Sequence, residues 1–315
     1  MSLQQEIINI AKKAKEASRI LASLDTKRKD KCLNKAAQLL IKGEKKILRA
    51  NARDIKAALM RGISGAMIER LTLNTKRISQ MAQSLKGVAS LRDEVGAISD
   101  MAKRPNGLWI VKMRVPIGVI AIIYESRPNV TADCAALTLK SGNSVILKGG
   151  SEAINSNMAI YDVLKEAMKK TGLPEGAVNL IKTTDRKAVE VLLKQDSLID
   201  LVMPRGGEGL IRKVAAMSRI PVIKHYKGVC HVYVDKYADL NMAHRIAINA
   251  KVQRPSVCNA MESLLVHKDV ARKFLPRLLS EMKAAGVEIR GCPKTRSLAV
   301  WAKAVKESDW STEYL

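Results

Sequence analysis

The feature of this sequence that most constrains its fold is a regular alternation of short apolar runs and helical stretches. The runs GVIAIIYES (118–126) and SVILKGG (144–150) are continuously apolar, as in strands buried on both faces. A helical pattern follows each run. The alternation continues through the runs VNLIK (178–182), IDLVMPRGG (199–207) and PVIKHYKGVCHVYVD (221–235). Strands separated by helices predict an α/β fold with a doubly wound parallel sheet.

Other elements flank this region. Residues 2–60 and 75–90 have helical periodicity, and RPNGLWIVKMRVP (104–116) is a hairpin candidate whose turn is Asn106-Gly107. A second, incomplete α/β unit begins near the strand ESLLVH (262–267). We therefore expect two domains, over residues 1–250 and 251–315, the second of them short of strands.

Composition narrows the function classes. The 315 residues contain 47% apolar residues, and 55 Lys and Arg against 30 Asp and Glu give a net charge of +25. Aromatic residues are scarce and the basic clusters are interrupted, which disfavours nucleic-acid binding. The net positive charge still produces a general electrostatic field that favours anionic ligands such as phosphates. No apolar run is long enough for a membrane span. Five scattered cysteines without a CxxC pair indicate a reducing cytoplasm.

Two glycine-containing turns follow predicted strands. The carboxyl ends of parallel strands are where α/β sheets bind ligands, and glycine lets backbone N–H groups approach a phosphate. Ordinary strand-to-helix turns would look the same, so nucleotide binding and a purely structural role stay open on this pattern alone. The candidate nucleotide-binding residues are Lys148, Gly149, Gly150, Ser151 and Glu152 in the first turn, and Arg205, Gly206 and Gly207 in the second.

Cys258 is a candidate nucleophile. It lies in NAKVQRPSVCNAMESLLVH, directly before the strand that opens the second unit, where it could be an exposed thiol that attacks a carbonyl carbon as a thiolate. By residue type alone, a buried apolar role is the stronger interpretation. The histidines have no metal-ligand or triad spacing, and no metal is assigned.

Two long motifs carry a resemblance to a known family. They are VPIGVIAIIYESRPNVTADCAALTLKSGNSVILKGGSEAINSN and NAKVQRPSVCNAMESLLVH. The chain closely resembles the glutamate-5-semialdehyde dehydrogenases, also called gamma-glutamyl phosphate reductases, of the aldehyde dehydrogenase superfamily. The resemblance implies a nucleotide-binding domain over 1–250, the start of a catalytic domain over 251–315, and a hairpin 104–116 that is part of an oligomerisation arm.

The resemblance also implies a reaction, which is NADPH-dependent reduction of L-glutamyl 5-phosphate in the cytoplasmic synthesis of proline. Cys258 matches the nucleophile, and Asn129 with the Cys258 N–H matches the oxyanion hole. Lys148 and Glu152 match contacts to the adenosine ribose, and the turn at Arg205 matches the loop near the pyrophosphate. Glutamate 5-kinase is the candidate protein partner.

Further expectations accompany the resemblance. Arg127 and Arg254 flank the two catalytic residues and are hypothetical ligands of substrate phosphate or carboxylate, with a capping or interface role as the alternative. The place of the water-activating glutamate of hydrolytic relatives holds Lys224 or His225, which fits an acyl-enzyme resolved by phosphate.

Family members continue beyond WSTEYL, so we expect a C-terminally shortened chain that does not form the family oligomer. A paralogue that binds nucleotide without catalysis is the alternative function.

Overall fold

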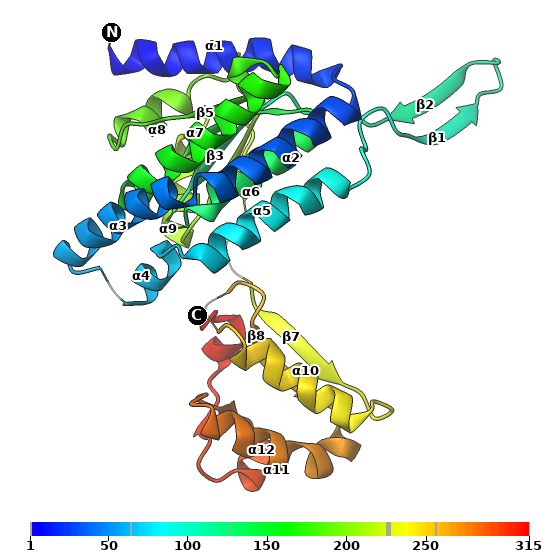
Figure 1. The fold of residues 1–315 in the computed structure, drawn as a ribbon. Helices are drawn as coiled ribbons and strands as arrows, with labels where there is room; N and C mark the ends of the chain where they lie inside the picture. Colours follow the sequence, from blue (N-terminus) through cyan, green and yellow to red (C-terminus); the bar gives the residue numbers. More distant parts are fainter. Residues whose placement is uncertain (1, 64, 126, 225–227, 256, 315) are drawn as a thin grey trace. The chain divides into compact units, whose positions relative to one another are not determined.

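The protein forms two compact units, Met1–Lys224 and His225–Leu315, which are described separately. The computed structural model describes residues 2–63, 65–125, 127–224, 228–255 and 257–314. Its helices and strands are labelled in Figure 1.

The first unit begins with five helices. Ser2 caps the first of them, because its hydroxyl accepts the Gln5 N–H at 3.2 Å. Asp25 and Asn74 cap later helices in the same way, with carboxylate or amide oxygens that accept the N–H groups of Arg28 and Arg77. The helices are α1 (Leu3–Ala22), α2 (Thr26–Lys42), α3 (Glu44–Met60), α4 (Gly65–Leu71) and α5 (Thr75–Ser90).

A four-stranded parallel sheet follows, as the apolar runs predicted. Its order is β5-β4-β3-β6, so the chain moves outward from β3 and then returns to place β6 on the other side of β3. The strands are β3 (Val119–Tyr124), β4 (Ser144–Lys148), β5 (Val178–Leu180) and β6 (Leu201–Arg205). The helices between and after them are α6 (Asn129–Lys140), η1 (Ser151–Ala153), α7 (Ile154–Thr171), η2 (Glu175–Ala177), α8 (Lys187–Leu192) and α9 (Glu208–Met217).

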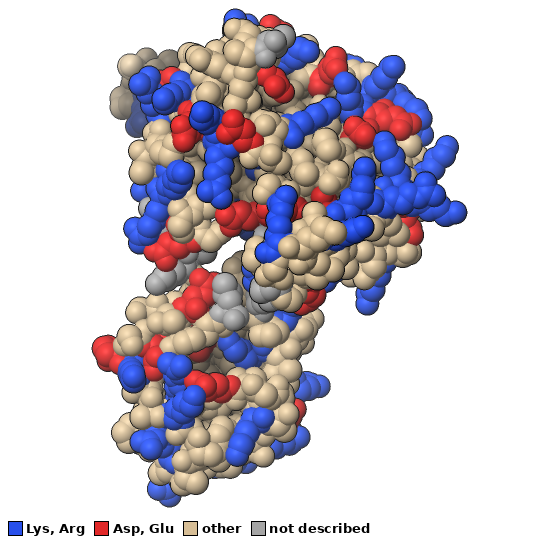
Figure 2. Space-filling model, turned by 90° about the vertical axis from the view of Figure 1, so that its left-hand side faces the viewer, with Lys and Arg blue, Asp and Glu red and all other residues tan. Residues whose placement is uncertain are grey.

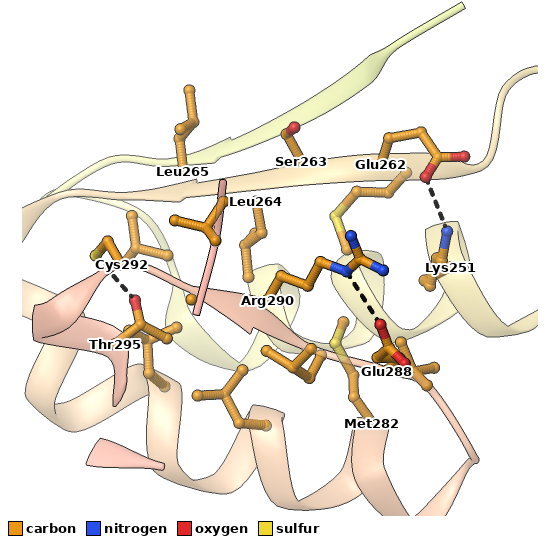
Figure 3. Close-up of a pocket in the computed structure, with 18 of the residues that line it drawn as sticks. Lys251, Glu262, Ser263, Leu264, Leu265, Met282, Glu288, Arg290, Cys292 and Thr295 are labelled. Atoms are coloured by element: carbon orange, nitrogen blue, oxygen red, sulfur yellow. Dashed lines mark hydrogen bonds and ion pairs between the residues drawn. The ribbon is translucent and has the colours of Figure 1, made fainter. Parts of the chain in front are cut away.

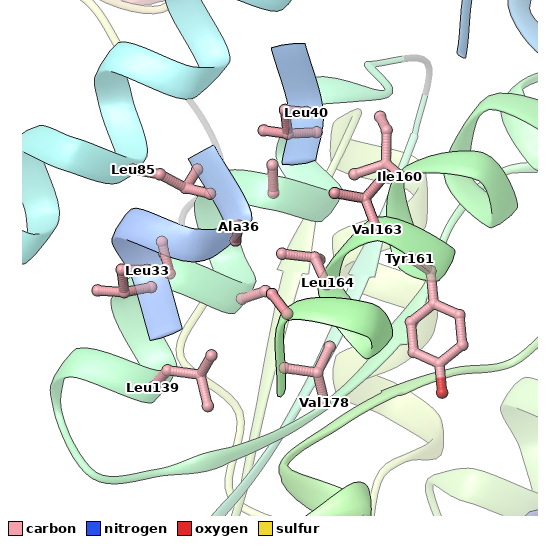
Figure 4. Packing of buried hydrophobic residues seen from close by; sticks show 14 of the residues in the cluster. Leu33, Ala36, Leu40, Leu85, Leu139, Ile160, Tyr161, Val163, Leu164 and Val178 are labelled. Carbon is pink, nitrogen blue, oxygen red and sulfur yellow. The ribbon is translucent and has the colours of Figure 1, made fainter. Parts of the chain in front are cut away.

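Helices cover both faces of this sheet, which makes it doubly wound. Every residue of β3 is buried, and alternate side chains enter opposite cores. On one face Ile120, Ile122 and Tyr124 pack with apolar side chains of α2, α5, α6 and α7. Figure 4 shows helical members of this cluster, among them Leu33, Leu85 and Leu164. On the other face Val119 and Ala121 pack with side chains of α1, α8 and α9. The α/β doubly wound class predicted from the sequence is confirmed.

Asp200 joins α1 to the start of β3. Its carboxylate accepts the Lys15 ammonium at 2.8 Å and the Val119 N–H at 2.8 Å. A Cβ on Gly118 would lie 2.2 Å from the Asp200 carboxylate, and Gly118 has a φ of +123°. Both facts require glycine at this position.

One lysine of the basic segment TKRKDK is fully buried. The Lys29 ammonium donates to the Asp93 carboxylate at 2.9 Å, and the Thr26 hydroxyl and the Val95 N–H donate to the same carboxylate. Burial alone would raise the pKa of Asp93, but these hydrogen bonds outweigh it and the pKa is lowered. The pair therefore ties α2 to the segment that follows α5.

The hairpin lies slightly earlier than expected. Its strands are β1 (Ile98–Lys103) and β2 (Trp109–Met113), paired antiparallel, so residues 104–116 contain only the turn and the second strand. The turn includes Gly107 at a φ of +86°, as the Asn-Gly signal predicted. The first strand, ISDMAK, was missed because it has no apolar run. All residues of both strands are exposed, and the ribbon projects away from the helices of its unit (Figure 1).

The second unit is built around two short parallel pairs, β7 with β8 and β9 with β10. The strand HVYVD was expected to belong to the first domain, but it forms part of β7, which pairs with β8. The compact units accordingly divide at Lys224/His225 and not at the expected 250/251. The elements are β7 (Cys230–Val234), α10 (Leu240–Val252), β8 (Met261–Val266), α11 (Lys268–Ala284), β9 (Arg290–Gly291), α12 (Pro293–Leu298), β10 (Lys303–Ala304) and η3 (Glu307–Ser311).

The core of the second unit explains this division. Val234 of β7 and Ala247 of α10 are buried in one cluster with Met261, Phe274 and Leu278. The start of the run 221–235 forms only a single bridge, between Val222 and Val202 in the first unit. None of the described helices combines the length and apolar character that crossing a bilayer requires.

Candidate active site

Three strand ends meet at one edge of the first unit's sheet. Lys148 at the end of β4 is in register with Ile123, and Arg205 at the end of β6 is in register with Tyr124. The turns after β3, β4 and β6 therefore lie side by side, at the point where the strand order switches around β3. Such switch points are where open α/β sheets bind ligands.

The first turn begins with a buried lysine. Lys148 is 6% exposed, and its ammonium donates to the Gly149 carbonyl at 2.9 Å. Burial lowers the pKa of Lys148, and the nearby Glu152 carboxylate offsets part of that effect. A partly desolvated cation at the end of a strand is suited to bind a polar ligand group.

Gly149 lies against a buried polar network that sequence reasoning did not find. A Cβ on Gly149 would lie 2.2 Å from the Asn157 amide nitrogen and 3.2 Å from the Tyr124 ring. The Thr131 hydroxyl contacts the Tyr124 hydroxyl at 2.7 Å and donates to the Asn157 amide oxygen at 3.1 Å. Glycine is therefore required by side chains from β3 and α7, and no local sequence signal marks them.

The helix after this turn is fixed by Asp54 of α3, also missed from the sequence. The Asp54 carboxylate is buried, and it accepts the backbone N–H and amide of Asn155 and the N–H and hydroxyl of Ser156, at 2.6–3.1 Å. These bonds satisfy donors at the N-terminus of α7. Gly150, Ser151 and Glu152 thus lie between a fixed strand end and a fixed helix start.

The second turn is held by Glu125. Its carboxylate accepts the Gly207 N–H at 3.0 Å, and its own N–H donates to the Arg205 carbonyl at 3.2 Å. A Cβ on Gly206 would lie 2.4 Å from the same carboxylate, whereas one on Gly207 would meet nothing within 4 Å. Glu125 therefore joins the ends of β3 and β6, next to the N-terminus of α9.

Asn129 is the first residue of α6 and is half-buried. Its amide nitrogen donates to the Asp133 carboxylate one helical turn later, at 2.9 Å. An amide group has two N–H donors, and the contact with Asp133 uses one of them. Arg127 precedes it, half-buried, with its backbone N–H on the Glu125 carbonyl at 2.7 Å. The i to i+4 spacing of Asn129 and Asp133 could have revealed this positioning contact.

Cys258 lies in a turn of the second unit. The Ala260 N–H donates to the Val257 carbonyl at 3.0 Å, and the Cys258 side chain is exposed. The buried apolar interpretation of Cys258 is therefore wrong. The Cys230 thiol donates to the Cys258 carbonyl at 3.4 Å, a contact that the sequence did not reveal. Arg254 precedes this turn and is also exposed.

The expected catalytic pair is divided between the units. Asn129 belongs to the first and Cys258 to the second, so their joint action stays a prediction. Lys224 is the last residue of the first unit, and His225 lies outside the described residues.

A cavity of about 890 Å³ lies within the second unit. Its walls come from β8, α11, β9 and α12, and its charged groups include the Arg290–Glu288 pair at 3.0 Å and the Lys251–Glu262 pair at 3.2 Å (Figure 3). Cys258 is not among the residues that line it. The cavity and the expected nucleophile are therefore different places in this unit.

Charge is spread over the surface. On the face drawn in Figure 2, Lys and Arg side chains of both units alternate with acidic and uncharged ones. Within the described ranges, no group of three or more His, Cys, Asp or Glu side chains could hold a metal ion.

Comparison with known proteins identifies the family and the relatives of this chain. The model of the aldehyde dehydrogenase family matches residues 2–300. The gamma-glutamyl phosphate reductase of Thermodesulfovibrio yellowstonii is 53% identical over 315 residues, which are all of this chain and 75% of that protein. That of Caldanaerobacter subterraneus is 54% identical over 305 residues, covering 97% of this chain and 74% of the relative.

Solved structures agree with these sequence matches. The crystal structure of gamma-glutamyl phosphate reductase from Thermotoga maritima superposes with a TM-score of 0.88 at 45% identity, over 98% of this chain and 75% of that one. A probable aldehyde dehydrogenase from Listeria monocytogenes, at 16% identity and a TM-score of 0.64, shares the fold. The doubly wound sheet, the long motifs and these matches together place the chain in the aldehyde dehydrogenase family, among the gamma-glutamyl phosphate reductases.

Proposed function

We propose that this chain is an NADPH-dependent reductase that converts L-glutamyl 5-phosphate to L-glutamate 5-semialdehyde and phosphate, in the synthesis of proline from glutamate. The observation that carries the proposal is 53% identity over all 315 residues to a protein named gamma-glutamyl phosphate reductase. The exposed thiol of Cys258 supplies the nucleophile that such a reaction needs.

The turns of the first unit suit a dinucleotide. Gly149 and Gly206 keep two strand ends free of side chains where a Cβ would collide with Asn157 or with Glu125. Lys148 and Glu152 would hold the adenosine ribose region, with Gly150 and Ser151 between them. Arg205, Gly206 and Gly207 would lie near the pyrophosphate, where the N-terminus of α9 favours negative charge. When bound, NADPH supplies the hydride that reduces the thioester.

The chain's own residues perform the remaining chemistry. The Cys258 thiolate attacks the acyl phosphate carbon, the C–O bond to phosphate breaks, and a thioester forms. Donors at Asn129 and at the Cys258 N–H stabilise the oxyanion. After reduction, the thiohemiacetal expels the thiolate, and glutamate 5-semialdehyde leaves. Asp133 holds the Asn129 amide, so the oxyanion donor is oriented before substrate binds.

The substrate carries two anionic groups, a phosphate and a carboxylate. We propose that Arg127 or Arg254 binds one of them through its planar guanidinium group. Arg127 precedes Asn129 by two residues and Arg254 precedes Cys258 by four, so each is close in sequence to a catalytic candidate.

The test is NADPH oxidation, followed at its absorbance band while glutamate 5-kinase, glutamate and ATP generate glutamyl phosphate in place. We expect turnover with the wild type, faster with NADPH than with NADH. Cys258→Ser should abolish turnover and leave NADPH binding unchanged, because a hydroxyl without a base is a far weaker nucleophile. Cys292→Ser, a half-buried thiol of the same unit, is the control. NADPH binding without wild-type turnover would indicate the non-catalytic paralogue.

A further inference from the structure

Cys230 and Cys258 are neighbouring residues of the second unit. The Cys230 sulfur lies 3.4 Å from the Cys258 carbonyl oxygen, although 28 positions separate them in the chain. The strand pairing explains the proximity, because Cys230 opens β7 in register with Met261, which opens β8 three residues after Cys258. Parallel strands that start at one edge therefore place the two cysteines side by side.

The two cysteines differ in exposure, and one of them lies in a turn. Cys258 is exposed, and Cys230 is half-buried. Cys258 is the second residue of the turn closed by the Ala260 N–H on the Val257 carbonyl, so backbone adjustment there breaks no strand hydrogen bond. Disulfides need Cα atoms about 4.4–6.8 Å apart. Because the Cys230 sulfur already contacts the Cys258 backbone, this turn is the segment that would move to bring the two sulfurs together.

We propose that Cys230 and Cys258 are a redox pair that forms a reversible disulfide when the chain meets a peroxide. The proposal concerns the thiols themselves, and its effect on activity rests on the proposed role of Cys258 as nucleophile. The disulfide would withdraw that nucleophile and protect it from irreversible oxidation.

The chemistry balances with hydrogen peroxide as the two-electron oxidant. The Cys258 thiolate attacks one peroxide oxygen, the O–O bond breaks, and the departing hydroxide takes a proton to become water, leaving a sulfenic acid. The Cys230 sulfur then attacks the sulfenic sulfur, the S–O bond breaks, and a second water leaves. Two thiols are oxidised by two electrons in total, and one peroxide is reduced to two waters.

The remaining cysteines have other surroundings. Cys292 precedes α12 and shares a hydrogen bond with the Thr295 hydroxyl at 3.4 Å, which contributes most to lowering its pKa. It is the competing thiol of the same unit. Cys32 and Cys134 belong to the first unit, and burial raises the pKa of both, that of Cys134 to about 12. A buried thiol with a raised pKa is rarely ionised, so it reacts slowly.

The experiment treats the purified 315-residue chain with a small excess of hydrogen peroxide, alkylates free thiols, and maps peptides by mass spectrometry without reduction. We expect a 230–258 cross-linked peptide that has lost two hydrogen atoms, and the loss of two titratable thiols per chain. Dithiothreitol should restore both thiols. In Cys230→Ser, the same treatment should drive Cys258 to sulfinic acid, which dithiothreitol does not reverse. Cys292→Ser should behave as the wild type.

Four results would overturn the proposal: Cys258 joined to Cys292, Cys258 joined to a second chain on a non-reducing gel, sulfinic acid at Cys258 in the wild type without a cross-link, or unchanged recovery in Cys230→Ser. The mass readout needs no catalysis, so it stands or falls separately from the proposed function. If the reductase activity is present, peroxide should abolish it and dithiothreitol restore it in the wild type, and restoration should fail in Cys230→Ser.

Discussion

Gly149→Ala tests whether the first turn has its shape because of side chains beneath it. The added Cβ would lie 2.2 Å from the Asn157 amide nitrogen and 3.2 Å from the Tyr124 ring. Asn157 is fully buried, and its amide oxygen accepts a hydrogen bond from Thr131, so a shift of its side chain would disturb buried packing and this bond. The turn itself must therefore shift, by about 1 Å or more to reach ordinary contact.

Overpacking of this kind costs about 1–3 kcal/mol. We expect Gly149→Ala to lower the free energy of unfolding by that amount in urea titrations followed by circular dichroism. It should also weaken NADPH binding, measured by nicotinamide fluorescence, because the displaced turn is part of the proposed nucleotide site. Removing the closer obstacle should relieve most of the effect, so adding Gly149→Ala to an Asn157→Ala background should cost clearly less than adding it to the wild type.

The chain offers a matched control. Gly207 lies in the other candidate nucleotide turn at a φ of −65°, and a Cβ there meets nothing within 4 Å. Gly207→Ala should leave stability within about 0.5 kcal/mol of the wild type. The buried network would not be what shapes this turn if Gly149→Ala changed the free energy of unfolding no more than Gly207→Ala does. The same conclusion would follow if Gly149→Ala cost as much in the Asn157→Ala background as in the wild type.

Three further outcomes follow from the site and the core. Asn129→Ala should lower kcat of the proposed reduction by on the order of 10²–10³-fold with the KM for NADPH unchanged; a loss confined to KM would contradict an oxyanion role. Lys148→Met should raise the Kd for NADPH roughly tenfold, the effect of one hydrogen bond to a charged group, and an unchanged Kd by fluorescence titration would exclude contact with the cofactor. The lowered pKa of Asp93 means that its stabilising effect is present above its unfolded pKa and is lost as the pH falls through its folded pKa. In urea titrations below about pH 4, the free energy of unfolding should therefore depend less on pH for Asp93→Asn than for the wild type. Equal slopes would show that the Asp93 carboxylate does not cause the loss of stability at low pH.

Much of the first unit could be predicted because local sequence and burial agree there. Mainly apolar runs are typical of strands covered on both faces, and β3, β4, β5 and β6 all lie within such runs. The glycine turns were found for a similar reason, since they directly follow those runs.

The elements that were missed or misassigned are those whose position depends on pairing between segments distant in the sequence. The strand Ile98–Lys103 is fixed by pairing with β2, and its exposed side chains form no continuous apolar run that would mark it locally. β7 could not be assigned to a unit from its own residues, because its place is set by pairing with β8 across a helix. The side chains that fix the candidate site, Asn157 and Glu125, likewise lie on elements that only the fold brings to the turns.

The Lys15–Asp200 contact also bears on synthesis at the ribosome. The core that receives Ile7, Ala11 and Ala14 of α1 contains Val202 of β6, and the ion pair spans 185 positions. At about 5–20 residues per second, α1 emerges roughly 10–40 s before Asp200 and β6 are made. The same core also contains Val119 of β3 and Ile146 of β4, which are made earlier, so the surface that covers α1 is completed in stages. Early binding of a chaperone to the nascent α1 would protect its apolar face until these strands are translated.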